Sequence, residues 1–219
     1  MNKLVKTHKL FKCETNYIKP LLNEEYPWQI LSKIKPYIEN FCKSNFSNFV
    51  EISKGVYIGS NVKIAKSAVI EQNVIIGDNC EIRQGAYIRG NVIIGNNCVI
   101  GNSCELKNSI ILNNVQIPHF NYVGDSILGN YVHMGAGAIC SNLKADKNNI
   151  VIHGDKEYHT QLHKVGAFLG DYVEIGCGCV LNPGTIIGRN TSVYPLISVR
   201  GVFPENSIVK DKNNIVNKI

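Results

Sequence analysis

Aliphatic side chains recur at every sixth position through the middle of this chain. Eleven successive positions at this spacing hold isoleucine or leucine: Ile52, Ile58, Ile64, Ile70, Ile76, Ile82, Ile88, Ile94, Ile100, Leu106 and Leu112. The spacing resumes at Leu128, Met134 and Cys140, and again at Leu169, Ile175, Leu181, Ile187, Val193 and Val199. A period of six matches neither the 3.6-residue period of a helix nor the two-residue alternation of a strand. It predicts a solenoid in which each hexad forms one short strand and one corner, and three hexads complete a triangular coil.

Small residues and turn formers occupy the positions between these aliphatic side chains. A column of small residues precedes the large column by two positions: Val56, Val62, Ala68, Val74, Cys80, Ala86, Val92, Cys98 and Cys104. Gly and Asn fill most corner positions, in segments such as GSNV, GDNC and GNNC, and both tolerate the backbone angles of tight corners. The sequence therefore predicts an all-β solenoid whose stacked coils bury one continuous core.

The repeat also accounts for most of the eight cysteines. The small column holds Cys80, Cys98, Cys104 and Cys179, and the large column holds Cys140. A buried free cysteine behaves as a small apolar side chain, so neither disulfides nor a metal site are needed to explain these thiols. Reduced thiols are typical of the cytoplasm, where we expect this chain to reside.

The composition of the 219 residues is that of a folded domain, with 44% hydrophobic and 18% charged residues. A net charge of +6 suits small anionic molecules, but it is too weak to indicate nucleic-acid binding. The N-terminus lacks the apolar core of a signal peptide. No run of 18 apolar residues occurs, so we expect no membrane association.

The sequence divides into three regions. Residues 1–50 lack the hexad, and apolar residues from Trp28 to Phe41 follow helical spacing, so we expect a short N-terminal helical cap over the first coil. The solenoid should span residues 51–200, with loops at 117–125 and 141–165, and residues 201–219 should form a loose or helical tail. The first glycine is Gly55, so no glycine-rich phosphate loop precedes the repeats. We therefore expect no nucleotidyl transfer by this chain alone.

Two cationic residues are placed to meet on one face of the solenoid. Arg89 and Lys107 each follow an inward aliphatic residue, and they are 18 residues apart, which is one coil. Their side chains should stack on neighbouring coils, roughly 4.8 Å apart by the spacing of paired strands. Two adjacent cations repel each other, so we expect an anionic partner such as a phosphate.

A carboxylate and a histidine lie close to these cations in the repeat. Glu105 precedes Lys107 by two residues, and His119 follows it by twelve residues, or two hexads. A neutral histidine beside a carboxylate is a suitable general base. We expect His119 to be the base and Glu105 to orient its ring.

The segment from AYIRG (86–90) to SNLK (141–144) resembles the acetyltransferase domain of bacterial N-acetylglucosamine-1-phosphate uridyltransferases. It is also similar to the C-terminal half of archaeal sugar-phosphate nucleotidyltransferase/acetyltransferases. These families carry an Arg, a Glu-x-Lys, a His-x-x-Tyr-x-Gly-Asp and an Asn after Gly-Ala-Gly. Here the motifs fall on Arg89, Glu105, Lys107, His119, Tyr122, Gly124, Asp125, Gly135, Ala136, Gly137 and Asn142. The resemblance implies a left-handed parallel β-helix, a handedness that the repeat spacing does not itself determine.

The same resemblance implies an acetyl-CoA-dependent N-acetyltransferase of an amino-sugar phosphate such as glucosamine 1-phosphate, in UDP-N-acetylglucosamine biosynthesis. His119 would deprotonate the acceptor amine, Arg89 and Lys107 would bind the phosphate, and Tyr122, His133 and Asn142 would contact the sugar. His133 stands where the bacterial family has an Asn, and Cys177 where it has a Ser. Acetyl-CoA would contact Gly135, Ala136, Gly137, Cys177, Pro195 and a loop lysine, either Lys144 or Lys147. A backbone N–H near Gly135–Gly137 would stabilise the oxyanion.

The resemblance also implies a homotrimer, no metal, and a separate nucleotidyltransferase as partner. Three other functions remain open at this point. A non-catalytic scaffold that partners a sugar nucleotidyltransferase would need none of the site residues, and a sugar O-acetyltransferase could use the same base. A γ-class carbonic anhydrase would bind zinc through three histidines, but the close pair His159 and His163 lies outside the repeat.

Overall fold

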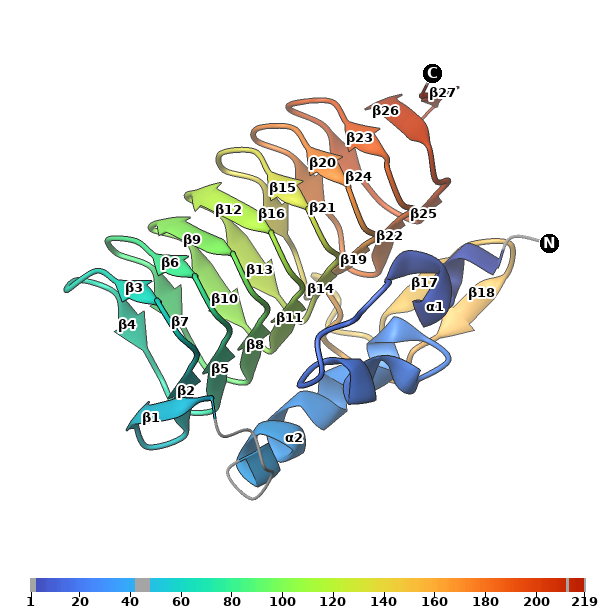
Figure 1. The fold of residues 1–219 in the computed structure, drawn as a ribbon. Helices are drawn as coiled ribbons and strands as arrows, with labels where there is room; N and C mark the ends of the chain where they lie inside the picture. Colours follow the sequence, from blue (N-terminus) through green and yellow to red (C-terminus); the bar gives the residue numbers. More distant parts are fainter. Residues whose placement is uncertain (1–2, 42–47, 212, 219) are drawn as a thin grey trace.

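The computed structural model describes residues 3–41, 48–211 and 213–218, and most of them form a parallel β-solenoid (Figure 1). Three sheets make its sides, and successive strands of the chain belong to successive sheets. Sheet A contains β1 (Val50–Ser53), β2 (Val56–Ile58), β5 (Val74–Ile76), β8 (Val92–Ile94), β11 (Ser109–Ile111), β14 (Ile127–Leu128), β19 (Ala167–Leu169), β22 (Thr185–Ile187) and β25 (Val202–Phe203).

The other two sides are built in the same way. Sheet B contains β3 (Lys63–Ile64), β6 (Glu81–Ile82), β9 (Val99–Asn102), β12 (Gln116–His119), β15 (His133–Met134), β20 (Glu174–Ile175), β23 (Ser192–Val193), β26 (Ser207–Asp211) and β27 (Asn214–Asn217). Sheet C contains β4 (Val69–Ile70), β7 (Tyr87–Ile88), β10 (Glu105–Lys107), β13 (Tyr122–Gly124), β16 (Ile139–Cys140), β21 (Val180–Leu181) and β24 (Ser198–Val199). All pairs within these sheets are parallel, except β1 with β2 and β26 with β27. The expected all-β solenoid is confirmed.

The predicted columns form the interior. Large aliphatic residues such as Ile76, Ile94 and Leu106 are fully buried in one core cluster, together with the small column. The five cysteines assigned to these columns are buried, and none of the seven described cysteines is in a disulfide. Between sheets A and B, the left-handed backbone position is mostly asparagine, whose amides bond from coil to coil, as between Asn61 and Asn79 at 3.1 Å. Asparagine tolerates this conformation better than most residues.

The six-residue frame breaks earlier than the sequence suggested. Ser109 pairs with Val92, so this coil has 17 residues (109 − 92) instead of 18. The corner that contains Asn108 is one residue shorter than the same corner of the preceding coil. Ile111 consequently points inward, whereas Leu112, which we assigned to the core column, packs on the outside of the solenoid. Ile110, Ile111 and Leu112 are consecutive aliphatic residues, so the spacing alone could not distinguish the two frames.

The region 117–125 is not the loop that we expected. It forms β12, a corner and β13, and Ile117 and Val123 remain in the core column. The second 17-residue coil closes after this region, where Ile127 pairs with Ile110. The shortened coils and the insertion after Asn142 all change the corner between sheets C and A. The other two corners keep a constant length through these coils.

The N-terminal segment does not cap the first coil. It contains η1 (Lys3–Val5), α1 (Thr7–Leu10), η2 (Lys19–Asn23), η3 (Pro27–Lys33) and α2 (Ile34–Phe41), and it lies along the solenoid in Figure 1. It packs on the outer face of sheet A, which presents an apolar column: Tyr57, Ile75, Ile93, Ile110, Ile127, Phe168 and Ile186. Hydrogen bonds from the solenoid hold the backbone of this segment. The Lys12 N–H donates to the Asp171 carboxylate, and the Lys12 carbonyl accepts from the Asn130 amide. The Leu10 carbonyl accepts from Arg189. A cap covers only one end, whereas this outer column needs cover along its whole length.

The insertion at 141–165 contains a two-stranded hairpin, β17 (Val151–His153) and β18 (Glu157–His159). Tyr158 of this hairpin packs on Trp28 of η3, with ring centroids 5.9 Å apart. The expected C-terminal tail is also corrected, because residues 202–211 extend the solenoid through β25 and β26. Phe203 and Val209 supply its inward side chains. No helix among the described residues is long and apolar enough to cross a membrane.

Candidate active site

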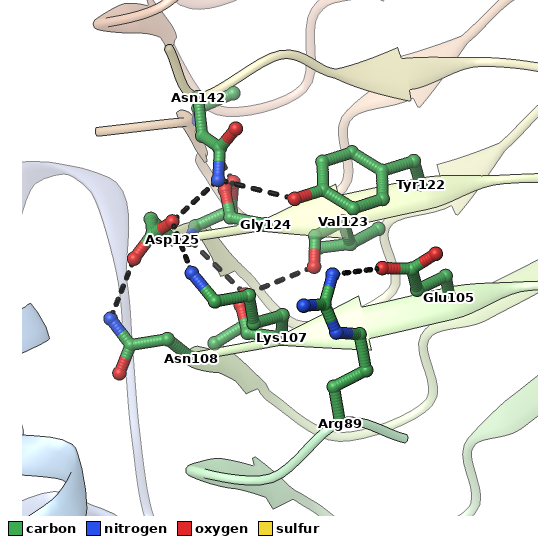
Figure 2. Close-up of polar contacts among 12 residues, drawn as sticks. Arg89, Glu105, Lys107, Asn108, Tyr122, Val123, Gly124, Asp125 and Asn142 are labelled. Carbon is green, nitrogen blue, oxygen red and sulfur yellow. Dashed lines mark hydrogen bonds and ion pairs between the residues drawn. The ribbon is translucent and has the colours of Figure 1, made fainter. Parts of the chain in front are cut away.

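A cluster of charged and polar side chains lies on the outer face of sheet C and at its end. Pairing of β7, β10 and β13 aligns Tyr87, Glu105 and Tyr122 in one column, and Lys107 with Gly124 in the next. Alternation along each strand points these residues outward, whereas Ile88, Leu106 and Val123 point into the core. The repeat thus brings residues more than thirty positions apart onto one surface (Figure 2).

Each cation of this cluster is already paired with a carboxylate. Arg89 Nη1 lies 2.7 Å from Glu105 Oε1, and Lys107 Nζ lies 3.5 Å from Asp125 Oδ2. The hydrogen bond with Glu105 raises the pKa of the Arg89 guanidinium. The expectation that two unbalanced cations require a phosphate is therefore wrong, because the two carboxylates offset their repulsion. An incoming phosphate would compete with these carboxylates for the same N–H groups.

Asp125 joins three successive coils. Its side chain is 7% exposed, and it accepts hydrogen bonds from Asn108 Nδ2 at 2.8 Å and Asn142 Nδ2 at 2.5 Å. The same Asn142 amide donates to the Tyr122 hydroxyl at 3.2 Å. The sequence analysis did not select Asn108 as a site residue. It occupies the shortened corner, and its position next to Asp125 follows only from the 17-residue register.

Gly124 gives Tyr122 and Asn142 the space for this contact. A Cβ at Gly124 would lie 2.5 Å from the Tyr122 hydroxyl oxygen and 2.8 Å from Asn142 Nδ2. Burial and, secondarily, the charge of Asp125 raise the pKa of Tyr122, so its phenol stays protonated at neutral pH. Because the hydroxyl accepts from Asn142, its own proton is available to a ligand on this face.

His119 lies at the end of β12, at the corner that leads to Tyr122. The backbone fixes this corner: the His119 N–H donates to Asn121 Oδ1 at 3.1 Å, and the His119 carbonyl accepts from the Gly137 N–H at 3.0 Å. Among the described residues, the exposed His119 ring has no hydrogen-bond partner. Glu105 bonds Arg89 and not this ring, so the expected Glu105–His119 orientation is not formed.

The residues expected to contact acetyl-CoA follow the same corner over the next coils. At this corner each coil is hydrogen-bonded to the next: the Gly137 N–H donates to the His119 carbonyl, the Gly178 N–H to Ala136, and the Leu196 N–H to Cys177. These bonds stack four residues at equivalent positions of successive coils: His119, Ala136, Cys177 and Pro195. A Cβ at Gly137 would meet nothing within 4 Å, so the surface is open there. The Gly135 N–H donates to Ile175 and the Gly137 N–H to His119. These two N–H groups are occupied, which leaves the Ala136 N–H, for which no acceptor is found among the described residues, as the one in this stretch open to the expected oxyanion role.

Three expected residues lie apart from this cluster. His133 is on sheet B, where its Nδ1 lies 3.1 Å from Glu174 Oε2. Lys144 pairs with Asp146 at 3.1 Å at the start of the insertion. Lys147 has a backbone hydrogen bond to Lys144 and accepts from the His163 ring at 3.1 Å.

The described residues contain no group of three or more His, Cys, Asp or Glu residues able to hold a metal. His159 and His163 have separate neighbours, Glu157 and the Lys147 carbonyl. The structure thus offers the carbonic anhydrase hypothesis no zinc site among these residues.

Comparison with known proteins finds similarity within the solenoid. Residues 53–156 match the family model of the EIF2B subunit epsilon LbH domain, LbH denoting a left-handed β-helix, the handedness expected from the resemblance. The bifunctional protein GlmU of Methanococcus maripaludis is 32% identical over 103 residues, which are 47% of this chain and 25% of that protein. A bifunctional sugar-1-phosphate nucleotidylyltransferase/acetyltransferase of Sulfurisphaera tokodaii is 36% identical over 81 residues, 36% of this chain and 20% of that protein. The chain spans about a quarter or less of these curated relatives.

Solved structures overlap only partly with this chain. A perosamine N-acetyltransferase from Caulobacter crescentus, in complex with CoA and GDP-perosamine, has 19% identity and a TM-score of 0.41, over 72% of this chain and 56% of that one. A hexapeptide transferase family protein from Anaplasma phagocytophilum has 18% identity and a TM-score of 0.43, over 75% and 79%. Overlap of this extent says nothing about activity.

Proposed function

We propose that this chain is an acetyl-CoA-dependent N-acetyltransferase whose acceptor is an amino-sugar phosphate such as glucosamine 1-phosphate. The observation that carries the proposal is the convergence of Arg89, Lys107, Tyr122 and Asn142 on one face (Figure 2), with His119 at the corner that leads into the strand of Tyr122. The similarity to bifunctional GlmU proteins and to a sugar-1-phosphate nucleotidylyltransferase/acetyltransferase supports the same reaction class. The N-acetylated product would then serve a separate nucleotidyltransferase in UDP-N-acetylglucosamine synthesis. We further propose a cytoplasmic homotrimer.

The acceptor would bind over sheet C. Its phosphate would take N–H donors of Arg89 and Lys107, displacing part of their bonds to Glu105 and Asp125, since charge-assisted bonds to phosphate are strong. Tyr122 would donate its free proton to a sugar oxygen, held in place by Asn142. These contacts would present the amine towards the corner at His119.

His119 would act as the general base. Its ring is exposed, and among the described residues it has no partner to occupy its lone pair. It can accept the proton of the amine as the amine attacks the thioester carbonyl. The C–S bond then breaks, and the CoA sulfur leaves as a thiol by taking the proton from His119, so the direct transfer needs no acyl-enzyme. Acetyl-CoA supplies the acetyl thioester, and the corner formed by Ala136, Cys177 and Pro195 is the surface along which it would lie.

Product detection by mass spectrometry tests the proposal. Wild-type protein is incubated with acetyl-CoA and glucosamine 1-phosphate, beside His119→Ala and the control His159→Ala, which removes an exposed histidine of the hairpin. We expect N-acetylated product from wild type and control, and a rate about a hundredfold or more lower with His119→Ala, the effect of losing a general base. A variant at position 119 that keeps the wild-type rate would refute the assigned base.

A scaffold function is the second candidate. Two observations favour it: the cations of sheet C already have carboxylate partners, and the matching family model is that of an EIF2B subunit. A scaffold would make no product with any amino-sugar acceptor, and would instead bind a nucleotidyltransferase without any requirement for His119. Product with an acetylated hydroxyl in place of the amine would indicate sugar O-acetylation.

A further inference from the structure

A cavity of about 360 Å³ lies between the insertion and the C-terminal half of sheet C. The start of the insertion supplies one wall, and the ends of β16, β21 and β24 supply the floor. Its polar lining consists of Ser141, Lys144, Asp146, Asn182 and Arg200. None of its lining residues belongs to the cluster around Asp125, and only Lys144 among them was expected, from the resemblance, to contact acetyl-CoA.

Arg200 is the unusual member of this lining. The other arginines are paired with carboxylates: Arg83 with Glu81 at 3.2 Å, Arg89 with Glu105 at 2.7 Å and Arg189 with Asp171 at 3.5 Å. Among the described residues, Arg200 has no carboxylate within ion-pair distance, and its Nη2 lies 3.3 Å from His153 Nε2. The remaining N–H groups of its exposed guanidinium are available to a ligand in the cavity.

The rest of the lining suits an anion. Lys144 and Arg200 carry two positive charges and Asp146 one negative charge, which leaves an excess of one positive charge (2 − 1). Asp146 is held by the Asn148 N–H at 3.0 Å and by Lys144 at 3.1 Å, so its carboxylate is already bonded. Asn182 is fixed by its bonds to Ser198 and Val199. An anion here would meet a planar guanidinium, which binds two phosphate oxygens at once.

The distance to the acceptor site sets the size of the ligand. Tyr122, Ile139, Val180 and Ser198 pair in succession, so Arg200 lies three strands beyond Gly124, roughly 14 Å at the usual strand spacing. One phosphate cannot reach both sites. The corner expected for the acyl donor runs over the same coils through Ala136, Cys177 and Pro195, which precede β16, β21 and β24, whereas Ser141, Asn182 and Arg200 follow these strands. A ligand that reaches both must therefore be long enough to cross the outer face of sheet C.

We propose that the Arg200 cavity binds the diphosphate group of an elongated phosphorylated ligand. The choice of ligand rests on the proposed acetyl transfer, because the donor and the acceptor of that reaction are the phosphorylated molecules considered. Two sources share this chemistry: the diphosphate of CoA, and a nucleoside diphosphate attached to the acceptor sugar. In the second case the acceptor is a nucleotide-linked amino sugar.

Isothermal titration calorimetry tests this with four probes: inorganic pyrophosphate, CoA, UDP and glucosamine 1-phosphate. The proteins are wild type, Arg200→Ala, Arg200→Lys and the control Arg83→Ala, which removes another solvent-exposed arginine. We expect Arg200→Ala to lower the affinity for pyrophosphate about tenfold or more, because a charge-assisted hydrogen bond is lost. Arg200→Lys should recover part of the affinity, because lysine keeps the charge without the planar fork. Arg83→Ala should leave it unchanged.

The other probes separate the sources. If Arg200→Ala lowers the affinity for CoA but not for UDP, the cavity binds the diphosphate of the acetyl donor. If it lowers the affinity for UDP but not for CoA, the cavity binds the diphosphate of a nucleotide-linked acceptor sugar. Glucosamine 1-phosphate should keep its wild-type affinity, because its proposed site is at Arg89 and Lys107. If it binds no variant while pyrophosphate still depends on Arg200, the proposed acceptor fails and the cavity stands. Equal affinity of wild type and Arg200→Ala for pyrophosphate, CoA and UDP, or no binding of these probes, overturns the proposal.

Discussion

Asp125 shows how single residues build the candidate site from a repeat that is otherwise structural. It adopts a left-handed backbone (φ 48°) at the corner after β13, where its buried carboxylate meets side chains from the coils below and above. A buried carboxylate is costly unless it is paired and hydrogen-bonded. Lys107, Asn108 and Asn142 supply these partners, and Asp125 in turn fixes two residues that we propose contact the acceptor.

Gly124 gives a prediction at this scale. Gly124→Ala would introduce a Cβ 2.5 Å from the Tyr122 hydroxyl and 2.8 Å from Asn142 Nδ2. Both atoms are at the ends of side chains that can move outward, but Asn142 Nδ2 would then leave the buried Asp125 carboxylate, so we expect the free energy of unfolding to fall by about 1–3 kcal/mol. The Tyr122–Asn142 contact would be lost, and we expect acetylation to fall about tenfold or more, mainly through a higher KM for the acceptor.

Gly154→Ala is the matched control, because its Cβ would meet Val202 at 3.2 Å, far from the site and with no positive φ. Steady-state kinetics and thermal unfolding of both variants provide the comparison. Wild-type kinetics with Gly124→Ala would show that the Tyr122–Asn142 geometry is not needed for the reaction.

At the scale of elements, the N-terminal segment is joined to many coils. Trp28 is 6% exposed and packs against Tyr26, Tyr158 and Phe168. We expect Trp28→Ala to lower the free energy of unfolding by about 3–5 kcal/mol, the usual cost of truncating a buried aromatic residue. Trp28→Phe should recover much of this loss. Chemical denaturation monitored by circular dichroism measures both.

The position of the destabilisation distinguishes two roles of this segment. Because the segment packs from β2 to β22, Trp28→Ala should raise hydrogen exchange at sheet A amides in several coils, including that of Ile186. Faster exchange restricted to β1 and β2 would instead support the end cap that the sequence suggested.

The outer column of sheet A was present in the sequence but was not recognised. Pairs such as Ile75–Ile76, Ile93–Ile94 and Ile186–Ile187 place apolar residues on both faces of a strand, which is typical of strands buried on both sides. Period six, by contrast, predicted the coils, the core and the buried cysteines. It identifies residues that face inward and carries no information about what covers the outside.

The site was predictable to a similar extent. Spacing of 18 residues correctly placed Arg89 beside the coil of Glu105 and Lys107, because the coil length is constant there. The spacing could not reveal that the Glu105 carboxylate bonds Arg89 and not His119. Arg89 and His119 both lie within one coil of Glu105, so the repeat allows either as its partner. Side-chain choice between near neighbours depends on angles at the corner, which the repeat does not encode.

At the scale of the whole molecule, the solenoid separates its tasks by side. Sheet A is buried by the N-terminal segment. The corner between sheets C and A takes up the changes in coil length and also holds Asn108, Asp125 and Asn142. The outer face of sheet C and its corner to sheet B carry the other proposed site residues. The core beneath all three is continuous, so a change in any coil affects its neighbours. Stability should therefore respond to groups buried throughout that core, including the thiols.

The buried thiols predict that stability decreases in mild alkali. Burial raises the pKa of Cys140 to about 12, and also raises the pKa values of Cys104 and Cys179, above the reference of 9.0. Below pH 9 both folded and unfolded chains keep these thiols protonated. Between about pH 9 and pH 12 the Cys140 thiol ionises only in the unfolded chain, which costs stability at about 1.4 kcal/mol per pH unit, and Cys104 and Cys179 act in the same direction. Cys80, whose pKa is lowered by its hydrogen bond with Cys98, opposes this trend.

Guanidinium unfolding between pH 7.5 and 10.5 under reducing conditions measures the effect. We expect the free energy of unfolding to fall above about pH 9, and to fall less steeply in Cys140→Val, which keeps an apolar side chain of similar size but cannot ionise. The difference between the two proteins should be constant below pH 8.5 and should shrink above it. A constant difference up to pH 10.5 would mean that Cys140 ionises alike in both states, which contradicts its complete burial in the solenoid core.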